Sequence, residues 1–131
     1  MERKPSLAPD LVKEFVIAGH SDLDKVKAML SEQPSLINAA WDWGDGDFET
    51  ALGGAAHMGS REIALYLLDQ GAHMTIYAAA MLGELDLVKA IIQTQPYAHT
   101  FPGAHGIPLL VHAQQGGEAA ATVLSYLESL G

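Results

Sequence analysis

Small and hydrophobic residues follow a two-helix pattern that is clearest from Thr50 to Ala72, TALGGAAHMGSREIALYLLDQGA. The first half is rich in alanine and glycine and ends at Gly59. The second half places Ile63, Leu67 and Leu68 at the spacing that puts side chains on one face of a helix. Each predicted helix is too short to be stable alone, so the pattern predicts a helix pair that packs against similar neighbours.

Three other segments repeat this pattern in part. They are Phe15–Leu30, Met74–Ile92 and Ile107–Leu127, and each has small residues before a turn and aliphatic residues after it. The first two of these segments also share the sequence L-D-x-V-K-A. Repetition of a helix–turn–helix unit predicts a stacked solenoid. We therefore expect one all-α domain over residues 1–131, with units at about 6–33, 46–72, 73–96 and 105–131.

The spacing of the turn glycines indicates that one connection between units is shortened. Gly59 and Gly83 lie 24 residues apart, whereas Gly83 and Gly116 lie 33 residues apart. Residues 34–49 and 95–106 form long segments before the second and fourth units, where the chain has room for projecting loops, or fingers. The third unit has room for one tight turn only. We expect the two long fingers to become neighbours, with a partly closed notch between them.

The second unit resembles the ankyrin-repeat consensus. Its pattern T-A-L-x-x-A-A-x-x-G-x-x-x-I-x-x-x-L-L-x-x-G-A is similar to the family repeat, in which T-P-L-H opens the first helix. The resemblance covers about Leu11–Leu130, although Gly53, Tyr77 and Leu110 stand where the family usually has a histidine. It implies an ankyrin-like helix–turn–helix solenoid with long fingers before the second and fourth units. It also implies a binding surface rather than an enzyme.

In ankyrin-like stacks, partners contact the fingers and the exposed positions of the first helices. Carried onto this sequence, that surface has methionines, which adapt to peptides, and tryptophans, which anchor interfaces. Met81 is expected to be exposed, whereas inward packing of the tryptophans is an equally good interpretation. We expect a non-enzymatic module that binds a polypeptide in this groove. The expected contact residues are Trp41, Trp43, Asp47, Glu49, His57, Met58, Tyr77, Met81, Leu82, His105 and Gln114.

An alternative is a small-ligand or metal site, possibly catalytic, between the two long fingers. Asp47, Glu49, His57 and His105 would surround the opening of the notch and offer carboxylate and imidazole ligands. The competing interpretation is that the loop residues are solvated, with aspartate and glycine there to form turns. Because no two histidines have the spacing of a metal motif on one helix, the sequence assigns neither a metal nor a cofactor.

The composition limits the class of partner that the chain can be expected to bind. The chain has 16 acidic and 7 basic side chains and a formal charge of −9, which argues against nucleic acid and anionic membranes and favours a neutral or basic polypeptide. It has no cysteine, which excludes disulfides and thiolate zinc sites and fits a cytoplasmic location. No nucleophile elbow or phosphate-binding loop is present in the sequence, and no apolar run is long enough for a membrane span. We therefore expect a protein that is not an enzyme.

Overall fold

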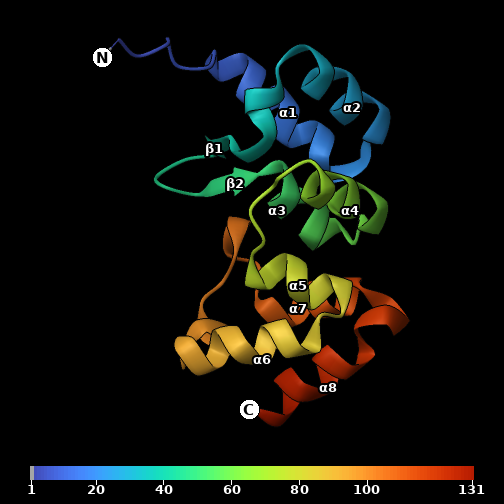
Figure 1. The fold of residues 1–131 in the computed structure, drawn as a ribbon. Helices are drawn as coiled ribbons and strands as arrows, with labels where there is room; N and C mark the ends of the chain where they lie inside the picture. Colours follow the sequence, from blue (N-terminus) through green and yellow to red (C-terminus); the bar gives the residue numbers. More distant parts are fainter. Residues whose placement is uncertain (1) are drawn as a thin grey trace.

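Eight α-helices follow one another in pairs in the computed structural model, which describes residues 2–131 (Figure 1). The prediction of a mainly helical chain is confirmed. The helices are α1 (Pro9–Ser21), α2 (Leu23–Glu32), α3 (Ala51–Met58), α4 (Arg61–Asp69), α5 (Ile76–Leu82), α6 (Leu85–Thr94), α7 (Leu109–Gln115) and α8 (Ala121–Ser129). The short elements are the 3₁₀ turns η1 (Pro34–Asn38), η2 (Ala98–Thr100), η3 (Ala104–Gly106) and η4 (Gly117–Ala120), and the strands β1 (Ala40–Asp42) and β2 (Phe48–Thr50).

The first helices of the middle two pairs, α3 and α5, begin and end with the same local signals. Thr50 caps α3 by accepting a hydrogen bond from the backbone N–H of Gly53, and Thr75 caps α5 in the same way. Gly59 and Gly83 end these helices in the left-handed conformation, with φ of 70° and 81°. Such a turn satisfies the last helical carbonyls and is readily adopted only by glycine. The chain can therefore reverse at once into the second helix of each pair.

The first helices of the pairs form one layer and the second helices form another. In the first layer α1 packs on α3, α3 on α5, and α5 on α7. Figure 1 shows the pairs following one another from the N-terminal end to the C-terminal end of the molecule. Alanines allow the first helices to approach closely: the predicted burial of Ala55, Ala56, Ala79 and Ala80 is confirmed. The core between the layers is built around residues such as Phe15, Leu52, Leu67, Val88 and Val123.

Two long connections project from the same side of this stack. The first finger is the antiparallel β1–β2 hairpin, in which Trp41 pairs with Glu49. The second finger, residues 95–106, contains the turns η2 and η3 and no strand. Between them the chain passes from α4 to α5 through residues 70–75 alone. The shortened connection predicted from the glycine spacing is therefore confirmed.

The first-helix layer curves enough for α3 to touch α7 as well as α5. A side-chain carbon at Gly59 would lie 2.6 Å from the carbonyl oxygen of Gln115, so the ends of α3 and α7 meet across α5. Met81 and Leu82 lie beneath this contact and are only 1% and 4% exposed. The prediction that Met81 is exposed is wrong, and neither residue can serve as part of an open groove. Met58 and Gln114, by contrast, are exposed.

Close approach of α1 and α3 should make Gly19 intolerant of even one methyl group. A side-chain carbon there would lie 2.6 Å from the Ala51 carbonyl oxygen, so Gly19→Ala should lower the free energy of unfolding by about 1–3 kcal/mol. Gly53→Ala is the matched control, because its nearest neighbours are at 3.5 Å and alanine favours a helix. Urea denaturation measures both variants. Equal stabilities of the two variants would contradict this packing.

Candidate metal site between the fingers

A buried carboxylate lies at the base of the first finger. Glu49 is in β2, one residue before the cap of α3, and is only 2% exposed. Its Oε1 accepts a hydrogen bond of 3.0 Å from the indole Nε1 of Trp43, on the turn of the same hairpin. A charged carboxylate without water is costly unless donors or cations surround it. One indole N–H does not supply that compensation.

Three imidazoles surround the carboxylate, and each comes from a different segment. His20 in the last turn of α1 places its Nε2 3.2 Å from Glu49 Oε1, and His57 in the last turn of α3 places its Nε2 2.9 Å from Oε2. His105, from the second finger, places its Nε2 3.3 Å from Oε1. One possible ligand atom from each of these four residues lies within 4.8 Å of all the others.

The other ring nitrogen of two of these histidines is already engaged. Nδ1 of His20 lies 2.9 Å from the carbonyl oxygen of Val16, which can only accept a hydrogen bond. Nδ1 of His105 lies 2.9 Å from Oδ2 of Asp47, whose Oδ1 accepts a 2.7 Å bond from the backbone N–H of His105. Both rings therefore carry a proton on Nδ1. In its neutral form each ring presents a lone pair at Nε2, as a metal ligand does.

Neutral rings alone leave this cluster short of positive charge. The Nε2 lone pairs of His20 and His105 would both face the Glu49 carboxylate, with only the ring of His57 free to donate. His57 Nε2 also lies 3.1 Å from His20 Nε2, so two lone pairs, or two N–H groups, cannot meet there favourably. The arrangement calls for a cation at its centre, either an additional proton or a metal ion.

The proton affinities of the metal-free cluster follow from these contacts. Burial raises the pKa of Glu49, but the hydrogen bond and charge of His20, the indole of Trp43 and the charge of His105 outweigh it and hold that pKa at about 2. The hydrogen bond to Glu49 raises the pKa of His20, in spite of burial. Burial lowers the pKa of His57, although Glu49 acts in the opposite direction. Without metal, His20 therefore holds an additional proton more readily than His57 does.

Metal coordination fits the same geometry. Zinc–nitrogen and zinc–oxygen bonds of about 2.0–2.2 Å place the ligand atoms of a tetrahedral site about 3.3–3.6 Å apart. The shortest nitrogen–oxygen and nitrogen–nitrogen contacts, which involve both oxygens of Glu49, are 2.9–3.3 Å, and one ligand atom from each residue lies within 4.8 Å of the others. Asp47 takes the place of the outer carboxylate that commonly orients a metal-binding histidine. Adjustment of the rings to equal spacing around one Glu49 oxygen would accommodate a first-row transition metal ion.

Sequence reasoning found most of this cluster. It placed Asp47, Glu49, His57 and His105 around one opening, and the structure brings these four residues into contact. It missed His20 as a member. The available signal was the repeat register, because His20 and His57 occupy neighbouring positions at the ends of successive first helices.

The remaining predicted contact residues are spread over the surface and the core. Trp43 lies against the cluster, with its ring centroid 5.6 Å from that of His105. Trp41 is partly buried against the N-terminal half of the core. The hydroxyl of Tyr77 donates to the backbone carbonyls of Phe101 and Pro102 in the second finger. Trp41 therefore packs inward, whereas Trp43 is partly exposed beside the cluster.

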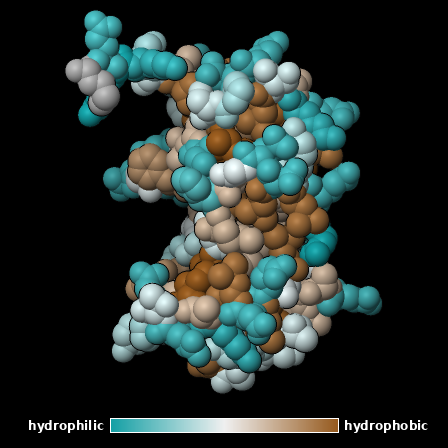
Figure 2. Space-filling model, viewed as in Figure 1, coloured by the Kyte–Doolittle hydropathy of each residue, from teal (hydrophilic) through white to brown (hydrophobic). Residues whose placement is uncertain are grey.

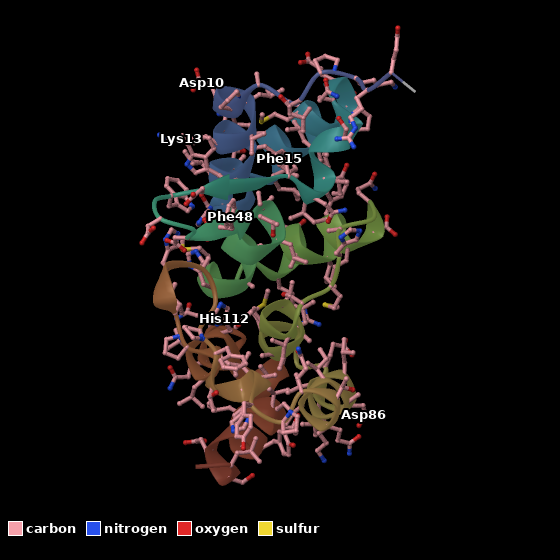
Figure 3. All side chains as sticks on the ribbon, turned by 90° about the vertical axis from the view of Figure 1, so that its left-hand side faces the viewer. Asp10, Lys13, Phe15, Phe48, Asp86 and His112 are labelled. Carbon is pink, nitrogen blue, oxygen red and sulfur yellow. The ribbon has the colours of Figure 1, made fainter. Side chains whose placement is uncertain are left out.

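A notch separates the fingers, as predicted. It has a volume of about 360 Å³, with walls formed by residues 46–50 and 102–104 and a floor that includes Gly53, Thr75 and Tyr77. Figure 2 shows the molecule hollowed on the hairpin side. Figure 3 faces this side and shows the hairpin, with Phe48 labelled, directly above the second finger. The side chain of Glu49 is wholly buried, so the notch runs beside the cluster and does not open onto its carboxylate.

Comparison of the chain with protein-family models gives no match, and comparison with curated proteins gives none either. Within residues 2–131, no helix combines the length and the apolar character that crossing a membrane requires.

Acid should destabilise the metal-free protein through Glu49. Its pKa is near 4.5 when unperturbed and about 2 in the fold, so its stabilising effect is complete above pH 4.5 and is lost as the pH falls through about 2. The full effect is on the order of 3 kcal/mol. With a chelator present, the difference in unfolding free energy between the wild type and Glu49→Gln should shrink from pH 5 towards pH 2.5.

Urea denaturation at a series of pH values measures this difference. Glu14→Gln is the control, because Glu14 is half-exposed and, within residues 2–131, forms an ion pair only with Lys25 at the surface. Its unfolding free energy should follow that of the wild type at every pH. Parallel pH curves for wild type and Glu49→Gln would contradict the assignment.

Proposed function

We propose that this chain is an ankyrin-like helical-repeat domain that binds one divalent transition metal ion through His20, Glu49, His57 and His105. The observation that carries the proposal is the convergence of four ligand atoms, from four separate segments, within 4.8 Å of one another. Its strongest support is that two of the imidazoles have Nδ1 engaged by acceptors and direct Nε2 at a buried carboxylate.

The ankyrin-like part of the proposal rests on the repeat pattern and on the helix arrangement. Paired helices in two layers, left-handed glycines after α3 and α5, and fingers on one side all agree with it. The histidine hydrogen bond that usually joins ankyrin repeats has no counterpart at Gly53, Tyr77 or Leu110. In its place, the proposed metal would join the first unit, the second unit and the second finger.

The ligand set favours zinc or a similar ion over magnesium and calcium. Three imidazoles and one carboxylate suit zinc, nickel, copper or iron, whereas magnesium and calcium prefer oxygen ligands alone. Four protein ligands are typical of structural zinc sites, in which no position is left for a substrate. We therefore propose a stabilising metal rather than a catalytic one, in agreement with the expectation that the protein is not an enzyme.

Polypeptide binding is the second candidate, and exposed apolar side chains near the fingers favour it. Phe48 on the first finger and Phe101 on the second are 61% and 58% exposed, and Met58 is 49% exposed. The acidic chain favours a neutral or basic partner. The surface proposed for this contact is the finger tips with Met58 and Gln114, without the buried Met81 and Leu82.

Zinc should bind to the metal-free wild type with a stoichiometry of one and raise its midpoint of thermal unfolding. Isothermal titration calorimetry measures the binding, and cobalt substitution gives the visible spectrum of the coordination geometry. His57→Ala removes a ligand and should weaken binding by more than the roughly 10- to 100-fold caused by losing an outer partner. His20→Ala should do the same.

His73→Ala is the matched control, because His73 is exposed and, in the part of the chain that the structure describes, only its backbone N–H makes a hydrogen bond, to Asn38. It should bind zinc as the wild type does. If the wild type shows no saturable binding, or if His57→Ala binds zinc as tightly as His73→Ala, the cluster is a hydrogen-bonded ion pair and the proposal fails.

A further inference from the structure

Besides the packing of Ala98 in the core, hydrogen bonds attach the second finger to the rest of the molecule at two points. Near its middle, the hydroxyl of Tyr77 donates to the carbonyls of Phe101 and Pro102 at 2.9 and 3.0 Å. Near its end, His105 bonds to Asp47 and Glu49 of the hairpin. The remaining hydrogen bonds of η2 and η3 are local to the finger. Its position against the hairpin therefore depends strongly on His105.

His105 has an unfavourable backbone conformation that depends on this attachment. Its φ of 60° and ψ of 18° are left-handed, which is unfavourable for a residue other than glycine unless its surroundings hold it there. Asp47 does so by accepting bonds from both the backbone N–H and the ring Nδ1 of His105. The contact of His105 Nε2 with Glu49, at 3.3 Å, is the longest in the cluster, and its side chain is the most exposed of the three imidazoles.

The other three proposed ligands lie on elements that the core already holds in place. His20 is on α1 and His57 is on α3, and these two helices pack directly on each other. Glu49 is in β2, which leads into α3 without an intervening residue. A metal ion could therefore bind to these three residues first and then recruit His105. Only His105 would have to bring a finger with it.

We propose that metal binding latches the second finger onto the hairpin and thereby completes the notch. This inference rests on the proposed metal site and assigns it a regulatory role. With metal, coordination by His105 holds residues 102–104 in place as one wall of the notch, opposite residues 46–50. Without metal, only the bonds to Asp47 and the 3.3 Å contact of His105 Nε2 with Glu49 hold this end of the finger, and the finger separates more often. The cavity of about 360 Å³ is then a metal-dependent cleft.

Hydrogen–deuterium exchange of the full chain, with zinc or with a chelator, tests the latch. Zinc should slow exchange in peptides that cover residues 98–107 by about 5-fold or more, the smallest factor expected for coupled sites. Peptides from α6 and α8 contain none of the ligands and should change much less, which provides an internal reference. Uniform slowing over the whole chain would overturn the latch, because it would mean that zinc only stabilises the fold.

His105→Ala separates the latch from metal binding itself. It keeps three ligands, so it should still bind zinc, more weakly, but zinc should no longer protect residues 98–107. Its α6 and α8 peptides report whether the variant is folded, and His73→Ala should behave as the wild type. Zinc binding to the wild type without protection of the finger would overturn the latch and leave the metal site standing. Absence of zinc binding would overturn both.

Discussion

The negative charge of one buried carboxylate, Glu49, has to be balanced, and this requirement organises the centre of the protein. Glu49 has almost no access to water, so donors must reach it from other parts of the chain. They come from the end of α1, the end of α3, the hairpin turn and the second finger. These segments are far apart in sequence, and they meet at this carboxylate. A single charge thus connects both fingers to the packed ends of α1 and α3.

Local signals explain why so much of the helical arrangement could be predicted from the sequence. Threonine caps, turn glycines and alanine pairs act within a few residues, and they recur at Thr50 and Thr75, and at Gly59 and Gly83. The burial of Met81 could not be predicted from these local signals, because it depends on the curvature that brings α3 against α7. Curvature is the sum of contacts between units, and no single repeat encodes it.

The candidate site shows the same division between local and long-range information. The shortened connection predicted that the fingers are neighbours, and this placed Asp47, Glu49, His57 and His105 around one opening. Placing His20 in the cluster required the distance between α1 and the hairpin, which the repeat pattern does not give. The ring orientations, with Nδ1 of His20 on the Val16 carbonyl and that of His105 on Asp47, were likewise beyond the sequence.

The short connection between α4 and α5 has a consequence for how such a chain could change over evolution. Residues 70–75 let α5 enter the stack directly, and the ends of α3 and α7 meet over it. An insertion that restored a full-length loop at this point would project between the two existing fingers. It would occupy the space through which His105 reaches Asp47 and Glu49. The four-residue cluster therefore depends on the short connection, and a more regular repeat would not bring these residues together.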